Sequence, residues 1–116
     1  MSYDIDLKYP DGTIAKVGRH SEGGTYVLGG ASEASLNITW NYAPFYYKHI
    51  DGEFGIRWLY GKTGLETKEV LRIAVEELGA KQYRDYWAPT PGNAGFALSI
   101  LLMWAKQHPE AVWSGN

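Results

Sequence analysis

The sequence predicts an α+β fold in which a small N-terminal antiparallel sheet packs against C-terminal helices. Apolar and polar residues alternate through residues 3–9 and again through residues 36–42, the period of a half-buried strand. A capping sequence at Thr63 opens a helical pattern in the second half of the chain. The last helical segment, residues 90–108, is apolar on nearly opposite sides, and such a helix must be buried on more than one face.

The strands are expected in the first half of the chain. Residues 3–9 form the first, and Pro10-Asp11-Gly12 has the turn chemistry to return the chain as a hairpin over residues 13–17. Residues 25–28 predict another short strand, and residues 36–42 give the clearest alternation. Together these segments predict the small antiparallel sheet.

The strand predicted over residues 36–42 has two different faces. Its apolar face carries Leu36, Ile38, Trp40 and Tyr42, and its polar face carries Asn37, Thr39 and Asn41. We expect the apolar face to pack in the core, because alternate side chains of a strand point to opposite sides of the sheet. The polar face then offers a row of short hydrogen-bonding groups to a ligand.

The second half predicts helices. Residues 45–50 and 56–60 are short segments, and a longer helix runs from the Thr63 cap to Leu78, with Gly79 at its end. The helix over residues 90–108 is expected either in the centre of the monomer or at a subunit interface. The tail, residues 111–113, is expected to dock back on a chain that forms one domain of residues 1–116.

Composition excludes several classes of protein. A net charge of −2 excludes binding to a nucleic-acid polymer through massed lysine and arginine. With no cysteine there is no disulfide, cysteine zinc site or thiol nucleophile. The start of the sequence does not resemble a signal peptide, and residues 94–105, the longest apolar run, are shorter than the roughly 20 residues that span a bilayer. We therefore expect a cytoplasmic protein with no membrane partner.

Catalytic motifs are absent from the sequence. The three histidines are far apart, no hydrolase elbow is present, and Ile56 stands where a phosphate-binding loop ending at Gly61-Lys62-Thr63 needs glycine. We therefore assign no catalytic residue, no metal and no cofactor. Convergence of two loop carboxylates in space stays open, so the sequence favours binding over catalysis without excluding an enzyme.

Aromatic residues make up 15% of the chain, more than so small a core can bury, so some should line a ligand pocket or an interface. We expect Tyr46, Tyr47 and Trp87 to be exposed, and we expect cations and the start of the last helix to attract an anion. Lys48 and Lys62 are nearby cations. The candidate ligand-binding residues are Tyr26, Asn37, Thr39, Asn41, Tyr46, Tyr47, Arg57, Arg84, Tyr86, Trp87 and Asn93.

Distinctive motifs cover most of the chain: Gly23-Gly24-Thr25-Tyr26-x-Leu28-Gly29-Gly30, Glu33-Ala34-x-Leu36-Asn37-Ile38-Thr39-Trp40-Asn41-Tyr42, Gly55-Ile56-Arg57, Tyr60-Gly61-x-Thr63-Gly64, Tyr86-Trp87-x-x-Thr90-x-Gly92-Asn93-Ala94 and Trp113-x-Gly115. On these motifs the chain resembles a family of small uncharacterised proteins of tailed phages and prophages. The resemblance implies a role in countering host defence. In size and style the chain is similar to proteins that sequester immune nucleotides, such as cyclic ADP-ribose derivatives or cyclic dinucleotides.

Three functions follow, in order of preference. The first is a homo-oligomeric protein of the host-cell cytoplasm that binds and sequesters a small nucleotide-like ligand. The second is an inhibitor or accessory protein whose aromatic residues contact a protein partner from the host or the phage. The third is a hydrolase of a nucleotide signal.

Overall fold

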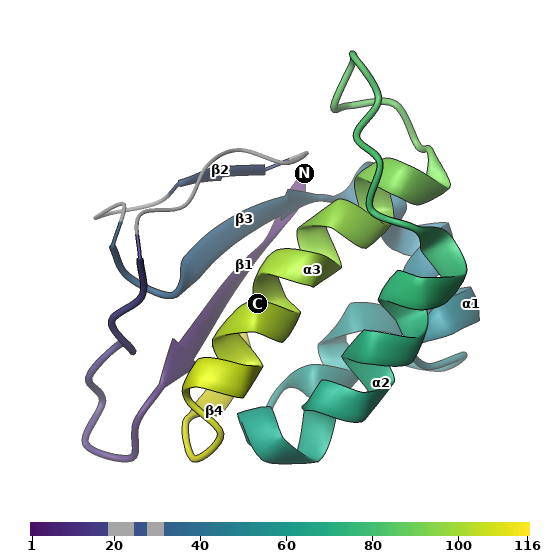
Figure 1. The fold of residues 1–116 in the computed structure, drawn as a ribbon. Coiled ribbons are helices and arrows are strands. Elements are labelled where there is room, and N and C mark those ends of the chain that lie inside the picture. The colour runs from purple at the N-terminus through teal and green to yellow at the C-terminus, as the bar shows by residue number, and fades with distance from the viewer. Residues whose placement is uncertain (19–24, 28–31) are drawn as a thin grey trace.

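The computed structural model of the protein describes residues 1–18, 25–27 and 32–116, and the side chains of these residues other than 25–27. Four antiparallel strands form one sheet in the order β2-β3-β1-β4 (Figure 1). The strands are β1 (Ser2–Lys8), β2 (Thr25–Val27), β3 (Ser35–Thr39) and β4 (Val112–Gly115). The predicted sheet is confirmed, and the tail docks as expected, because β4 pairs with β1 and becomes a fourth strand.

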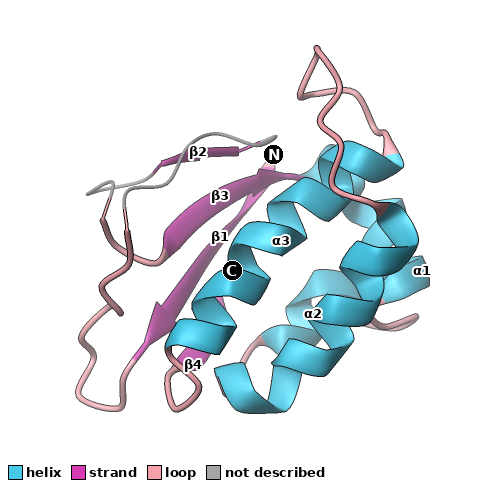
Figure 2. Cartoon of the chain, in the orientation of Figure 1, coloured by secondary structure: helices cyan, strands magenta, loops and turns pink. Residues whose placement is uncertain are grey.

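In the described ranges, three α-helices and two short 3₁₀ helices accompany the sheet, and the helices cover one of its faces (Figure 2). They are η1 (Trp40–Tyr42), α1 (Ala43–His49), η2 (Gly55–Leu59), α2 (Gly64–Leu78) and α3 (Pro91–Gln107). Within the described residues, no helix has both the length and the apolar character to cross a membrane.

Helix α3 lies in the centre of the molecule, which is one of the two positions that the sequence predicts for it. It lies between the sheet and α2 (Figure 1). Leu98 and Ile100 are both buried, although residues two positions apart lie on nearly opposite sides of a helix. The α+β architecture predicted from the sequence is therefore correct, and most of the apolar surface of α3 is buried within one chain, although Met103 remains exposed.

Alternation in β1 places its apolar side chains in the core. Tyr3, Ile5 and Leu7 are buried, whereas the residues between them are partly or fully exposed. Tyr3 and Ile5 stand opposite Ile38 and Leu36 of β3, so the two strands present one continuous apolar face. That face packs against the helices, which is the main source of stability for a sheet of this size.

The predicted cap of α2 is present in full. The Thr63 hydroxyl accepts a hydrogen bond from the amide of Glu66 at 3.1 Å, and the Glu66 carboxylate accepts one from the amide of Thr63 at 2.9 Å. Gly79 follows the helix with φ of 77°, a conformation that suits glycine. Both ends of α2 are therefore determined by local sequence.

Two glycines allow α3 to approach its neighbours. A Cβ atom at Gly95 would lie 1.7 Å from the carbonyl oxygen of Gly79, and one at Gly92 would lie 1.9 Å from that of Lys81. No side chain fits at such distances. The start of α3 therefore packs directly against the main chain that follows α2.

The hairpin predicted over residues 13–17 forms only in part. Lys8 and Lys16 each make an isolated bridge, with Ile14 and Glu33 respectively, and no regular strand results. Ala15 donates its amide to Leu7 and accepts one from Ala34. This segment therefore lies between the end of β1 and the chain leading into β3, instead of pairing with β1 alone.

The strand predicted to reach residue 42 ends at Thr39. There the Thr39 hydroxyl accepts a hydrogen bond from the amide of Asn41 at 3.2 Å and caps η1. The turn breaks the alternation, so the prediction that Trp40 packs in the core is wrong: its side chain is 41% exposed. Tyr42 stays fully buried, since the helical turn directs it inward again.

Candidate functional site

The loop between α2 and α3, residues 79–90, projects beyond the rest of the fold (Figure 1). Asn93 holds it from inside. Its side-chain amide donates to the carbonyl oxygens of Asp85 and Ala88, both at 3.0 Å, and its side-chain oxygen accepts the amide of Tyr83 at 2.8 Å. Asn93 is fully buried. In this structure the residue predicted to contact a ligand organises the 79–90 loop.

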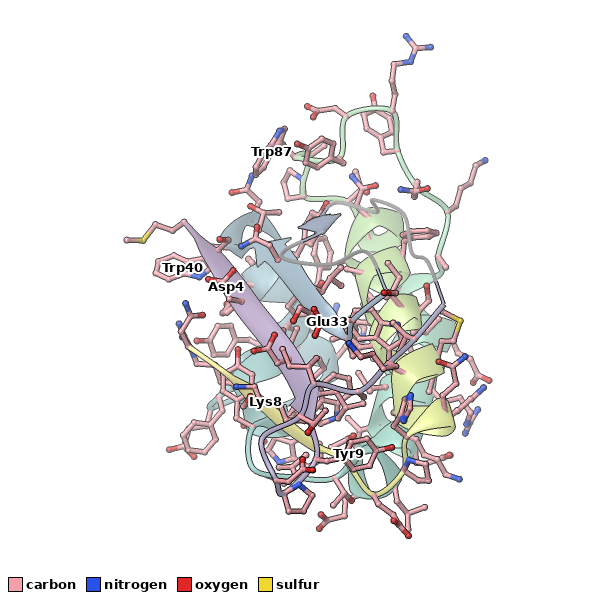
Figure 3. The ribbon with its side chains drawn as sticks, turned by 90° about the vertical axis from the view of Figure 1, so that its left-hand side faces the viewer. Asp4, Lys8, Tyr9, Glu33, Trp40 and Trp87 are labelled. Carbon is pink, nitrogen blue, oxygen red and sulfur yellow. The ribbon has the colours of Figure 1, made fainter. Side chains whose placement is uncertain are left out.

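The 79–90 loop is fastened to η1. The Asn41 side chain donates to the carbonyl oxygen of Trp87 at 2.9 Å, and the Tyr42 hydroxyl donates to that of Tyr86. The rings of Tyr86 and Trp87 are in contact, with centroids 4.8 Å apart and planes tilted by 34°. Figure 3 shows Trp87 on the same side of the molecule as Trp40.

Two predicted members of the polar row are committed to the fold. Asn37 is nearly buried and donates to Ser2 Oγ and to Asp4 Oδ1, both at 2.6 Å. Thr39 caps η1. The expected row of hydrogen-bonding groups facing a ligand is therefore not found at these two positions, because neighbouring strands and the following turn supply their partners.

The prediction that Tyr46 is exposed is wrong. Its side chain is fully buried, and its hydroxyl donates to the carbonyl oxygen of Ala94 at 3.0 Å. Burial raises the pKa of the Tyr46 hydroxyl well above its usual value of 10. Tyr47, in contrast, is exposed as predicted. The side chain of Tyr26 lies outside the described residues.

The strongest candidate site is a pocket of about 370 Å³ around η2, lined by Phe54, Arg57, Trp58, Tyr60 and Lys62 and called the η2 pocket below. The Lys62 ammonium donates to the carbonyl oxygen of Trp58 at 2.8 Å and lies 4.3 Å from the centre of its ring. The η2 pocket thus combines two cations with three aromatic rings. Such a surface can hold a flat, negatively charged molecule.

Arg57 connects the η2 pocket to the sheet. Its guanidinium carbon lies 5.1 Å from the ring centre of Tyr3 and 5.8 Å from that of Trp40. Its Nε donates to the main-chain oxygen of Asn116 at 3.0 Å, and the Tyr60 hydroxyl donates to the same oxygen at 3.3 Å. An aromatic and cationic surface therefore runs from the η2 pocket to Trp40.

The two cations that line the η2 pocket can attract an anion. Among the described residues neither Arg57 nor Lys62 pairs with an aspartate or glutamate side chain, whereas Lys16 pairs with Glu33 at 3.6 Å. Burial raises the pKa of Tyr60 to about 12; the nearby Arg57 acts in the opposite direction, and the negative charges of Asp4 and Asp6 act in the same direction as burial. The Tyr60 hydroxyl therefore keeps its proton at neutral pH and acts as a donor.

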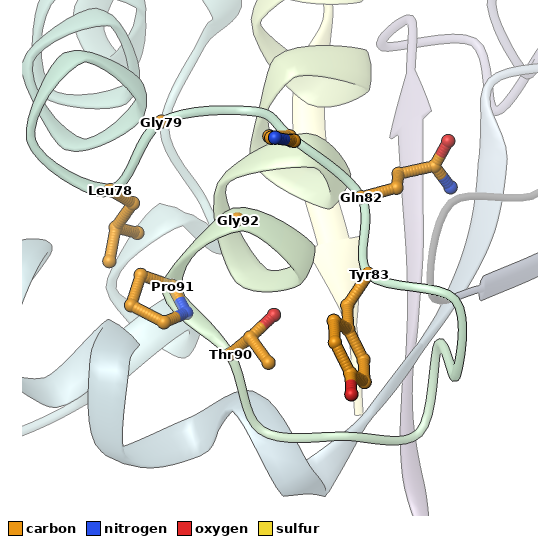
Figure 4. A pocket seen from close by; sticks show the side chains of 8 residues that line it. Leu78, Gly79, Gln82, Tyr83, Thr90, Pro91 and Gly92 are labelled. Atoms are coloured by element: carbon orange, nitrogen blue, oxygen red, sulfur yellow. The ribbon is translucent and has the colours of Figure 1, made fainter.

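The second predicted arginine, Arg84, lies at a different place. It lines a pocket of about 590 Å³ in the 79–90 loop together with Tyr83 and Asp85, so a carboxylate accompanies the cation there. An adjoining pocket of about 300 Å³ lies between the end of α2 and the start of α3 (Figure 4). It is lined by Leu78, Gly79, Lys81, Gln82, Tyr83, Thr90, Pro91 and Gly92. Arg57 and Arg84 therefore do not share one site.

Three residues of the η2 pocket were missed by the sequence analysis: Phe54, Trp58 and Tyr60. The segment around them reads as a short apolar helix, which predicts burial rather than a site. A usable signal was present, because three aromatic residues and two cations fall within residues 54–62. That density of rings and positive charge is the local pattern of a binding surface.

Metal ligands do not gather anywhere in the described part of the chain, where no group of three or more histidine, aspartate or glutamate side chains is placed to hold an ion.

Comparisons with protein-family models, with curated proteins and with solved structures find no match to this chain. The site must therefore be interpreted from its own geometry.

Proposed function

We propose that the protein binds a small nucleotide-like ligand in the η2 pocket and holds it without chemical change. The observation that carries this proposal is that Arg57 and Lys62 line one pocket with three aromatic rings and no carboxylate. Phosphate groups need cations, and bases need flat surfaces on which to stack. Both needs are met within nine residues of the chain.

The size of the η2 pocket sets the part of the ligand that it can enclose. At about 370 Å³ it is near the lower end of the range of about 300–1,000 Å³ for small-molecule sites. One base or one phosphorylated sugar fits this space, and the rest of a larger nucleotide would extend over Arg57 toward Trp40. Stacking of one base on an aromatic side chain contributes about 1–3 kcal/mol.

Binding without turnover is supported by the residues that line the η2 pocket. They include no histidine, serine or carboxylate to act as a base or nucleophile. The Tyr60 hydroxyl is protonated at neutral pH, and its pKa, raised to about 12, makes it a poor base. These features favour a binding protein over a nucleotide hydrolase.

The class of nucleotide to test first comes from the resemblance to phage proteins. A protein that sequesters a host immune signal binds cyclic ADP-ribose derivatives or cyclic dinucleotides, which carry both bases and phosphates. Sequestration requires only tight binding and slow release. Native mass spectrometry of freshly purified protein tests for a retained ligand and, in the same spectrum, for the homo-oligomer that the sequence analysis predicts.

The decisive experiment is calorimetric titration with adenosine monophosphate, cyclic ADP-ribose and cyclic dinucleotides. We expect at least one to bind and to be recovered unchanged, and the paired substitution Arg57→Ala with Lys62→Ala to weaken binding at least about tenfold. Arg84→Ala is the matched control, because it removes an arginine from a different pocket. Absence of binding across the panel, or equal loss with Arg84→Ala, would contradict the proposal.

A protein partner is the second candidate function. Met1, Trp40 and Trp87 are exposed, and the amide of Trp40 donates to the carbonyl oxygen of Met1 at 3.1 Å. Exposed tryptophans near one another are typical of interface hot spots. On this alternative, Trp40→Ala and Trp87→Ala abolish capture of a partner, whereas substitutions at Arg57 and Lys62 weaken a nucleotide only.

A further inference from the structure

The guanidinium of Arg57 is held from more than one side by its own chain. Its Nε donates to the main-chain oxygen of Asn116 at 3.0 Å. Its guanidinium carbon lies within 6 Å of the ring centres of both Tyr3 and Trp40, at 5.1 and 5.8 Å. Cation–π contacts and a hydrogen bond together fix both the position and the orientation of this side chain.

Asn116, which accepts from Arg57, is itself anchored to β1. Its side-chain oxygen accepts the amide of Asp4 at 3.0 Å, and its side-chain nitrogen donates to the Asp4 carboxylate at 3.4 Å. Gly115 allows this close approach, since a Cβ there would lie 2.5 Å from both the Asp4 carbonyl oxygen and the Tyr60 hydroxyl. The acceptor for Arg57 is therefore placed by the sheet.

This arrangement determines which edge of Arg57 remains for a ligand. Nε is committed to Asn116, and within the described residues Nη1 and Nη2 donate to no acceptor. The end of the guanidinium then presents two parallel N–H groups. That edge matches two oxygens bonded to one phosphorus or carbon atom.

We infer that Arg57 is a preorganised receptor for the two non-bridging oxygens of one phosphate group, contacted end-on through Nη1 and Nη2. Asn116 and Trp40 are positioning residues that act through Arg57. The inference rests on the proposed function for its ligand, and it adds the chemical group and the atoms that recognise it. A carboxylate presents a similar pair of oxygens, but Lys62 lines the same pocket and supplies a second positive charge, which suits a phosphate better.

The test compares ligands that differ only in the phosphate. Adenosine and adenosine monophosphate are titrated into the wild-type protein and into Arg57→Lys, which keeps the charge but loses the paired N–H groups. We expect Arg57→Lys to weaken the monophosphate about tenfold and to leave adenosine unchanged. Equal affinity of Arg57→Lys and wild type for the monophosphate would overturn the inference.

A second measurement does not depend on any nucleotide. In NMR spectra of the arginine side chains, inorganic phosphate should shift the Nη signals of Arg57 and leave its Nε–H signal in place. Acetate at the same concentration should shift the Nη signals less than phosphate does. Asn116→Ala should move the Nε–H signal before phosphate is added and weaken phosphate binding several-fold. Trp40→Phe keeps an aromatic ring beside Arg57 and should retain phosphate binding. A shift of Nε–H on adding phosphate, no Nη shift at all, or a larger effect of acetate overturns the inference.

These two experiments separate failure of the inference from failure of the proposed function. If no nucleotide binds but inorganic phosphate shifts the Nη signals, the receptor stands and the nucleotide proposal fails. If nucleotides bind to wild type and to Arg57→Lys alike, the proposed function stands and the end-on receptor is wrong.

Discussion

The indole nitrogen of Trp113 donates a hydrogen bond to the Thr67 hydroxyl at 2.7 Å inside the core, and so joins β4 to α2. The Thr67 hydroxyl in turn donates to the carbonyl oxygen of Thr63 at 2.9 Å. This link holds the strand that ends beside Asn116, which orients Arg57. The stability of the core and the geometry of the η2 pocket therefore depend on one another.

Replacement of Thr67 by valine should lower the free energy of unfolding by about 1–3 kcal/mol, because it leaves the buried N–H of Trp113 without an acceptor. Chemical denaturation measures the loss. Thr67→Ser is the matched control, since it keeps the hydroxyl and should be closer to wild type. Equal stability of Thr67→Val and wild type would show that this hydrogen bond contributes little.

Replacement of Asn93 by aspartate should release the 79–90 loop. The side-chain amide of Asn93 donates to the carbonyl oxygens of Asp85 and Ala88. Aspartate places a carboxylate oxygen there instead, and this acceptor is repelled by the two carbonyl oxygens. We expect a cost of about 1–3 kcal/mol and faster amide exchange at Tyr83. Hydrogen exchange followed by mass spectrometry measures it, and unchanged protection of the loop contradicts the assigned role.

Gly95→Ala should destabilise the protein by about 2 kcal/mol or more, because its methyl group meets the carbonyl oxygen of Gly79. Gly18→Ala is the control: its Cβ meets nothing among the described atoms, and its backbone does not require glycine. Thermal unfolding of the two variants provides the comparison. A similar midpoint for both would mean that the start of α3 can shift at little cost.

Tyr46→Phe tests whether this residue serves the fold or a ligand. Loss of the hydrogen bond to the carbonyl oxygen of Ala94 should cost about 1 kcal/mol of stability. Nucleotide affinity should stay the same, because the side chain is fully buried. Weaker ligand binding without loss of stability would restore the sequence-based prediction that Tyr46 contacts a ligand.

Stability should fall at alkaline pH. Burial raises the pKa of Tyr42 and of Tyr60 to about 12, above the value of 10 for an exposed tyrosine. Folding thus favours the neutral hydroxyls, a contribution fully present below pH 10 and lost as the pH rises toward 12. Urea unfolding at stepped pH, with tyrosinate absorption as a second probe, measures this. A flat stability curve between pH 10 and 12 contradicts it.

The elements predicted best from the sequence are those whose signals are local. The capping pair Thr63 and Glu66 lies within one helical turn, and its two hydrogen bonds form as predicted. The alternation in β1 likewise needs only neighbouring residues. Such patterns are strong because the hydrogen bonds or the buried face that they imply can hardly be satisfied in another conformation.

The errors arose where the main chain changes its geometry. Trp40 lies just after the end of β3, so its expected place on the strand face disappears once η1 begins. The sequence analysis predicts an exposed Tyr46, although this residue follows Tyr42 by four positions and both side chains are fully buried. A spacing of four is a helical signal, and it would have placed both tyrosines on one inward face.

The sequence by itself determined the α+β fold and the ends of α2, because local capping and periodic burial define them. It left two positions open for α3, and the tertiary structure decided for the centre of the fold. Only the tertiary structure decided the site. Arg57 is oriented by Asn116, 59 positions away in the sequence, and by the rings of Tyr3 and Trp40. No local sequence pattern encodes these contacts of Arg57, because they depend on β4 pairing with β1 and on η2 packing beside β4.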